Sequence, residues 1–291
     1  MLVLVFVLMQ YIVSAKAGLV NYIEGQANVH LREQVAASTP IQTSAQSHIE
    51  LLLNPGSYLR LGENSAAVLD SIELTNIAVR LVSGAAIIEA ADVDKQTPIH
   101  VTTGNLRVLI VSPGLYRFSG GTVLVLDGKL RIADSSMTVK KGHKIASLGD
   151  SYVDGNAAVA FSDGLDRWSE KRSFDLARAN AMAYRERSGA GSSSLGGYPG
   201  LALLSNGSTW LYSSMLGGFT FIPQPSYRSY YGYSFVPLSG FRRPATVGHS
   251  ASASRSPGGS TSTRSSTGGR PAGSAPVGGR VAGRSIGGSR R

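Results

Sequence analysis

From about residue 18 to residue 148, short apolar runs alternate with turn residues. Gly104-Asn105, Pro113-Gly114, Gly120-Gly121 and Asp127-Gly128 punctuate the second half of this region at short, regular intervals. Many short strands separated by such turns are typical of an all-β domain, built as a sandwich, a roll or a solenoid. No helical pattern connects the runs, which argues against a parallel α/β sheet. The pattern therefore predicts an all-β domain over residues 18–160.

One turn carries a particularly strong local signal. Asp127-Gly128 stands between the apolar runs "TVLVL" and "KLRIA". An Asp-Gly pair between two strand-like runs favours a two-residue hairpin turn, because both central positions of that turn need a positive φ. We therefore expect the two flanking strands to pair with each other.

The hydrophobic period changes at residues 161–187, which predict a single amphipathic helix. Ser162 or Asp163 is placed to cap its N-terminus, and acidic residues come early and arginines late, as the helix dipole favours. Leu165, Trp168 and Leu176 fall near one stripe, which the polar residues 171–173 interrupt.

Residues 188–240 form a segment rich in Gly, Ser and aromatic residues. Half of the aromatic side chains of the protein lie between residues 198 and 241, and a short hairpin is expected about Gly217-Gly218. Aliphatic residues are too few there for a separate core, so the segment either packs on the β-domain as a belt or lacks a fixed structure. Aromatic side chains are favoured at interfaces, and the expected interaction residues are Trp210, Tyr212, Tyr230, Tyr231 and Tyr233.

The N-terminus predicts export. Residues 2–13 form an apolar run too short to span a bilayer comfortably, and Ala15-Lys16-Ala17 provides the small-x-small pattern of a cleavage site. Residues 1–17 are therefore expected to be a signal peptide, with cleavage before Gly18 and a periplasmic or extracellular mature protein. The alternative is that the apolar run forms a buried first strand.

Almost all of the net charge of +10 lies in the C-terminal tail. Residues 241–291 contain nine arginines and no acidic residue, so the rest of the chain is close to neutral. Such a tail is expected to be disordered. In an exported protein it suits a cationic tether to an anionic polymer or a peripheral contact with a membrane, whereas RNA binding is the interpretation for a cytoplasmic chain.

The sequence predicts no catalytic, metal or cofactor site. Cysteine is absent, and the five histidines, at positions 30, 48, 100, 143 and 249, lack metal-site spacing. The chain also lacks a G-x-S-x-G nucleophile elbow and a phosphate-binding loop. The protein is expected not to be an enzyme.

The β-region resembles the FecR domain of bacterial envelope proteins. The resemblance rests on "SHIELLLNPGSYLRLGENSAAVL", "IAVRLVSGAAIIEA" and "TPIHVTTGNLRVLIVSPGLYRFSGGTVLVLDGKLRI", in that order. The family's turn and strand positions are occupied by Gly56, Leu61, Gly84, Thr97, Pro98, Gly114, Phe118, Val125 and Gly128. The helical segment that follows is similar to the one that trails such domains in some exported members. The resemblance implies an exported type without the anti-sigma segment of the iron-transport regulators.

Three functions are compatible with these patterns. The favoured one is a non-catalytic FecR-domain protein that acts as an interaction, scaffold or signalling module of the cell envelope, with an envelope protein or an anionic envelope polymer as partner. The second is a carbohydrate- or peptidoglycan-associated protein that uses its aromatic segment. The third is RNA binding through the tail.

Overall fold

The computed structural model describes residues 16–133, 135–148, 151–156, 163–189 and 207–241. All of them lie in the first of two compact units, which spans residues 1–246. The expected apolar export run, most of the Gly/Ser linker and the Arg-rich tail lie outside the described residues.

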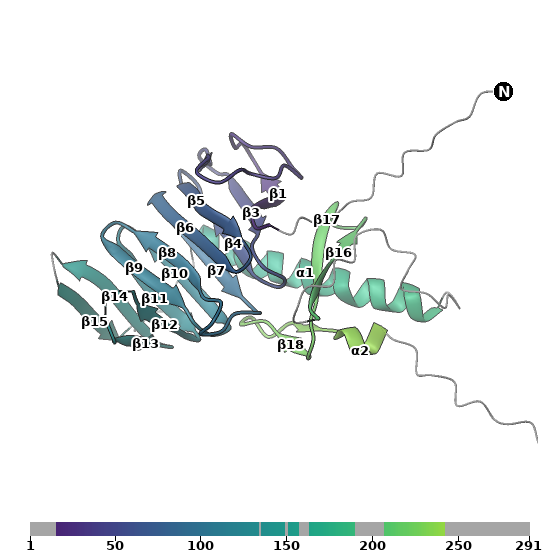
Figure 1. The fold of residues 1–291 in the computed structure, drawn as a ribbon. Helices are drawn as coiled ribbons and strands as arrows, with labels where there is room; N and C mark the ends of the chain where they lie inside the picture. The colour runs from purple at the N-terminus through teal and green to yellow at the C-terminus, as the bar shows by residue number, and fades with distance from the viewer. Residues whose placement is uncertain (1–15, 134, 149–150, 157–162, 190–206, 242–291) are drawn as a thin grey trace, which may run out of the picture. The chain divides into compact units, whose positions relative to one another are not determined.

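Two β-sheets form the body of the molecule (Figure 1). The eight-stranded sheet has the order β1-β3-β4-β7-β10-β11-β14-β15, and the seven-stranded sheet has the order β13-β12-β9-β8-β6-β5-β2. The strands of the first sheet are β1 (Leu19–Glu24), β3 (His48–Leu52), β4 (Tyr58–Leu61), β7 (Ala85–Ala90), β10 (Gly114–Ser119), β11 (Thr122–Asp127), β14 (His143–Leu148) and β15 (Ser151–Asn156). Those of the second are β2 (Pro40–Gln42), β5 (Ala66–Glu73), β6 (Asn76–Ser83), β8 (Ile99–Thr103), β9 (Leu106–Ile110), β12 (Lys129–Ile132) and β13 (Thr138–Lys140).

The chain builds these sheets by placing successive strand pairs in alternate sheets. Hairpin β3–β4 belongs to the first sheet, β5–β6 to the second, β10–β11 to the first and β12–β13 to the second. Alternating apolar residues of both sheets meet in one core, which includes Val20, Ile49, Leu69, Val108 and Phe118. The expected all-β domain is confirmed, with the sheets packed as a sandwich.

The hairpin expected at Asp127-Gly128 is wrong. β11 lies in the eight-stranded sheet and β12 in the seven-stranded sheet, so the chain passes from one sheet to the other at Gly128, whose φ is near +89°. The hydroxyl of Tyr116 fixes this crossing, because it accepts a hydrogen bond from Lys129 N at 2.9 Å. β11 pairs instead with β10 and β14, and the two-residue turn that joins β10 to β11 is Gly120-Gly121. A glycine with a positive φ can therefore connect strands of two different sheets as well as the two strands of a hairpin.

One long helix, α1 (Gly164–Gly189), confirms the helical prediction. Asp163 is its cap, since its Oδ1 accepts a hydrogen bond from Asp166 N at 3.0 Å. The helix packs on the outer face of the eight-stranded sheet, with β7 beneath it (Figure 1).

The aromatic segment folds back over the helix and the same sheet. It contains β16 (Thr209–Ser213), β17 (Gly218–Ile222), β18 (Tyr227–Arg228), β19 (Ser234–Phe235) and α2 (Leu238–Phe241). β16 and β17 form the hairpin expected about Gly217-Gly218. Amide side chains attach this hairpin on both sides: Asn21 of β1 accepts from Phe219 N and donates to Phe219 O, and Asn180 of α1 donates to Phe221 O.

Because β17 packs against the turn that contains Gly56, we expect a substitution of this glycine to lower stability more than usual. Its φ is +83°, and a Cβ there would lie 2.6 Å from Phe221 Cζ. We expect Gly56→Ala to lower the free energy of unfolding by about 2–5 kcal/mol, because overpacking adds to the left-handed backbone cost. Urea unfolding measures it.

Gly142→Ala is the matched control, since φ is +84° and no atom lies within 4 Å of its built Cβ. It should cost only about 1–2 kcal/mol. In a Phe221→Ala background the extra cost of Gly56→Ala should become smaller but not vanish, because Ala91 Cβ also lies 2.7 Å from the built Cβ. An unchanged cost would contradict the docking of β17 on this turn.

Candidate functional site

Charged side chains lie in the middle of four neighbouring strands of the eight-stranded sheet. Glu50 of β3 stands directly opposite Arg60 of β4, while Glu89 and Arg117 belong to β7 and β10. All four point to the outer face, since their neighbours in sequence fill the sandwich core. They are nevertheless buried, because α1 and the aromatic segment cover this face.

Arg60 is the centre of this cluster. Its side chain is completely buried, and it donates from Nε to Glu50 Oε2 at 2.9 Å and from Nη1 to Glu89 Oε2 at 2.7 Å. The same Nη1 donates to Ser169 Oγ of α1 at 2.8 Å. A buried guanidinium needs such charged partners, because an unpaired charge in the interior costs several kcal/mol.

α1 completes the cluster with side chains from its inner face. Arg172 donates from Nη2 to Glu50 Oε1 at 2.8 Å, and its guanidinium carbon lies 4.1 Å from the ring centre of Tyr22. Ser173 donates to Glu89. Arg60 and Arg172 therefore face Glu50 and Glu89, and the charges of these four side chains sum to zero.

Tyrosines of the aromatic segment close the cluster from above. Tyr231 OH donates to Ser169 Oγ at 3.0 Å, and Tyr227 OH donates to Glu89 Oε1 at 3.4 Å. Burial raises the pKa of both phenols well above the ordinary value, and so both remain protonated donors.

The electrostatics of the cluster keep Glu50 and Arg60 charged. Burial by itself would raise the pKa of Glu50, but the charges of Arg172 and Arg60, with hydrogen bonds from Arg172 and Asn21, lower it to about 2. Burial opposes the charged form of Arg60 as well, yet Glu89 and Glu50 raise its pKa above the ordinary value. The ionised state of each group thus depends on the others.

A second ion group anchors the start of the helix. Arg117 donates from Nη1 to Asp166 Oδ1 at 2.8 Å and from Nη2 to Asp163. Burial raises the pKa of Asp166, with Asp163 adding to the rise, whereas hydrogen bonds from the Asp166 amide and from Arg117 lower that of Asp163. The N-terminal carboxylates of α1 are thereby attached to β10.

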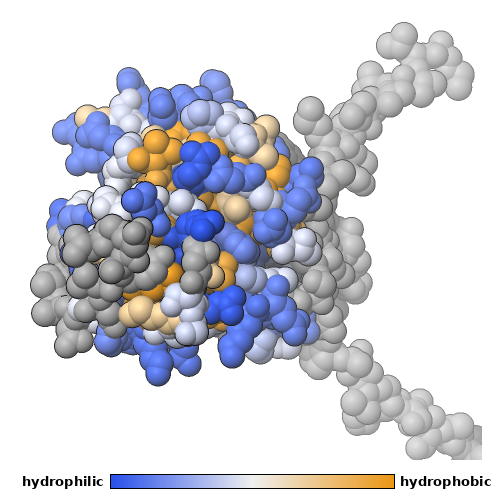
Figure 2. All heavy atoms as spheres, turned by 60° about the vertical axis from the view of Figure 1, so that its left-hand side comes forward, coloured by the Kyte–Doolittle hydropathy of each residue, from blue (hydrophilic) through white to orange (hydrophobic). Residues whose placement is uncertain are grey.

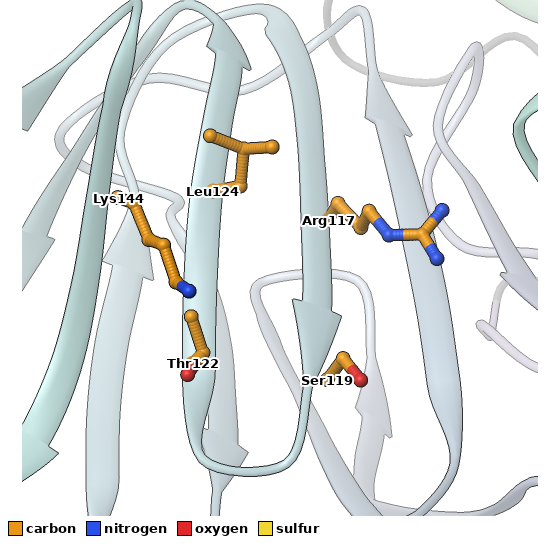
Figure 3. A pocket seen from close by; sticks show the side chains of 5 residues that line it. All are labelled: Arg117, Ser119, Thr122, Leu124 and Lys144. Atoms are coloured by element: carbon orange, nitrogen blue, oxygen red, sulfur yellow. The ribbon is translucent and has the colours of Figure 1, made fainter. Parts of the chain in front are cut away.

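A hollow of about 230 Å³ lies beside this ion group (Figure 3). Its lining residues are Arg117, Ser119, Thr122, Leu124 and Lys144. The guanidinium of Arg117 extends away from Lys144 in Figure 3, and its charge is already matched by two carboxylates. The remaining lining consists of the Lys144 side chain, the hydroxyls of Ser119 and Thr122, and the apolar side chain of Leu124.

The expected interaction residues occupy different environments. Trp210 is buried, with an exposed fraction of 4%, against Tyr58 and Phe221. Tyr212 is half-buried and accepts a hydrogen bond from Arg32 Nη2 at 2.7 Å. Tyr233 packs edge-on against Phe174 of α1, while Tyr231 belongs to the buried cluster.

Only Tyr230 among the five is exposed, at 40% of its surface. The structure thus brings four of these side chains to packing positions in or around the cover of the sheet. They do not form one continuous platform.

The sequence did carry a signal for the buried cluster. Glu50, Arg60, Glu89 and Arg117 each interrupt an apolar strand at a central position, in "HIELL", "YLRL", "AAIIEA" and "GLYRFS". A charge at the centre of an apolar strand is costly unless a partner covers it. Two of the polar residues that interrupt the helix stripe provide such partners, since Arg172 donates to Glu50 and Ser173 donates to Glu89.

Within the described ranges no three His, Asp or Glu side chains are grouped to hold a metal ion, and no helix is long and apolar enough to cross a membrane. Seen from the side of β13 and β15, apolar residues gather near the middle of the surface, with strongly hydrophilic residues among them (Figure 2).

Comparisons with known proteins find similarity within the sandwich. Residues 39–131 match the family model described as FecR protein. Two crystal structures from Parabacteroides distasonis ATCC 8503, of a protein named as an anti-sigma factor, match with TM-scores of 0.34 at 18% and 17% identity. These matches cover 40% of this chain and 59% of theirs. A comparison with curated proteins finds no match.

The buried cluster predicts a loss of stability in acid. Glu50 has a pKa of about 2 in the folded protein and an ordinary value of 4.5. Because the folded-state pKa is the lower one, its stabilisation is complete above pH 4.5 and is lost as the pH falls toward 2. The loss from this group is about 3 kcal/mol, measured by urea unfolding across that range.

Glu50→Gln isolates this contribution. It leaves two buried arginines with one carboxylate, and we expect a loss of about 3–5 kcal/mol at pH 7 and a flatter dependence on pH. Asp70→Asn is the matched control, because Asp70 pairs with Arg80 at the surface, and we expect a change below about 1 kcal/mol. Equal losses in the two variants would contradict the role of the cluster.

Proposed function

We propose that this chain, whose residues 39–131 form a FecR domain, is an exported, non-catalytic protein that acts as an interaction, scaffold or signalling module of the bacterial cell envelope. The proposal rests on one observation, which is that the charged side chains under α1 bond to one another. Glu50, Arg60, Glu89 and Arg172 bond to one another inside the molecule, where they attach α1 rather than face a substrate.

The proposed location rests on the sequence of the N-terminus. Lys16 and Ala17, the last residues before the expected cleavage, contact the sandwich in the uncleaved chain. Ala17 is buried in its core and donates from N to Ile72 O at 2.8 Å, and Lys16 pairs with Glu73 at 3.3 Å. Gly18 N donates to Leu52 O at 2.7 Å. A chain that begins at Gly18 keeps this last contact and the whole of β1.

The proposed partners are an envelope protein or an anionic envelope polymer. The Arg-rich tail supports the second, since nine arginines without acidic residues suit a weak, salt-sensitive tether.

Export predicts a new N-terminus. We expect protein purified from expressing bacteria to begin at Gly18 by N-terminal sequencing and to fractionate outside the cytoplasm. Ala15→Leu should block cleavage, because signal peptidase requires a small residue at that position, while it leaves the buried Ala17 intact. Cytoplasmic protein that keeps Met1 would overturn the proposed location.

Peptidoglycan association is the second candidate function, and the exposure of Tyr230 favours it. Its ring lies edge-on to Tyr231, with centres 5.2 Å apart, and 40% of its surface faces solvent, so one aromatic face can stack on a sugar.

This candidate predicts that purified peptidoglycan sediments the protein and that Tyr230→Ala reduces the bound fraction several-fold. Phe174→Ala is the control, because Phe174 is an equally exposed ring on α1. Equal binding by the two variants and the unmodified chain would exclude a role for Tyr230.

A further inference from the structure

The two faces of the sandwich differ in what covers them. α1 contacts β7, β16, β17, β19 and α2, all of them on the side of the eight-stranded sheet. Among the described residues, no comparable layer packs on the outer face of the seven-stranded sheet. That face consequently consists of the outward side chains of its own strands.

The outward side chains of this sheet are strongly basic. Strands β6, β8, β9, β12 and β13 carry five basic residues and no acidic one: Arg80, Arg107, Lys129, Arg131 and Lys140. All five are exposed. The acidic residues of the sheet lie on β5, where Asp70 is paired with Arg80 and Glu73 with Lys16.

Lys129, Arg131 and Lys140 have no acidic partner within the described parts of the chain. Lys129 stands directly opposite Lys140 in the pairing of β12 with β13. Like charges directly opposite each other on a sheet face lower stability. Folding therefore gives no reason for this pair.

These cations form a line that begins on β13 and continues along β12. Lys140 of β13 is opposite Lys129 of β12, and Arg131 lies two residues beyond Lys129 on the same face. Sheet geometry places successive members of the line about 5–8 Å apart. Leu109, which is opposite Arg131, forms an apolar floor beside the line with 6% of its surface exposed.

We propose that Lys140, Lys129 and Arg131 form a cationic track that binds an extended polyanion with regularly spaced phosphate groups. A row of separated cations on a sheet face fits a linear chain of charges, since no two of its side chains converge on a single small anion from opposite walls. The track deepens the proposed function by assigning a partner class to one surface, and its binding in solution is independent of export.

The test compares full-length variants on immobilised linear polyphosphate eluted with salt. We expect the triple variant Lys129→Gln, Arg131→Gln, Lys140→Gln to elute at clearly lower salt than the unmodified chain. Its slope of log affinity against log salt should fall, because fewer counterions are released. The control Lys95→Gln, Arg178→Gln, Arg185→Gln removes the same charge from exposed positions elsewhere and keeps the tail. It should shift elution much less.

Equal shifts in the two triple variants, or no shift in the first, would overturn the track, whatever the location of the protein. Retention by phosphatidylglycerol vesicles but not by polyphosphate, with dependence on the same three residues, would assign the face to a membrane and overturn the polymer proposal.

Lys140→Glu separates binding from folding. It places opposite charges across β12 and β13, so the melting temperature should hold or rise while retention on polyphosphate falls. A parallel fall in both quantities would show that Lys140 serves structure alone.

Discussion

The covered face of this protein depends on one buried cation. Arg60 has no contact with solvent, and its charge is matched by Glu50 and Glu89 on the two strands that flank it. The attraction between these groups offsets the cost of removing them from water only when the geometry is good and the remaining polar atoms are bonded. Ser169 bonds to Arg60 and Arg172 bonds to Glu50, and both come from α1, whereas Arg60 Nη2 and Arg172 Nε make no hydrogen bond among the described residues. The sheet and the helix are thus joined by one network of buried ion pairs and hydrogen bonds.

Local patterns predict the elements of this fold well. The alternation of apolar and turn residues predicts the all-β domain, the cap at Asp163 predicts the start of α1, and Gly217-Gly218 predicts the β16–β17 turn. Each of these features depends on residues close together in the sequence. The belt of aromatic residues was one of two open alternatives, because its docking depends on Asn21 and Asn180, which lie far from it in the chain.

The errors and omissions have a common physical origin. Asp127-Gly128 permits the backbone conformation of a hairpin, but the partner of each flanking strand is set by the packing of two whole sheets. The buried cluster likewise depends on the register of β3, β4 and β7, which brings together residues that are isolated charges in the sequence. In the other sheet, the register of β12 against β13 likewise places Lys129 opposite Lys140. The sequence around a residue does not show which residues of other strands will lie beside it.

The long sequence separation within the buried cluster constrains the order of folding. Arg60 and Glu50 are ten residues apart, but Arg60 and Ser169 are 109 apart. Closing a long loop is slow relative to forming a hairpin, so the sheet can assemble while its outer charges are still hydrated. The helix then removes water from partners that already face each other. On this route no charge is buried alone, and the folding barrier need not include the full cost of dehydrating an unpaired arginine.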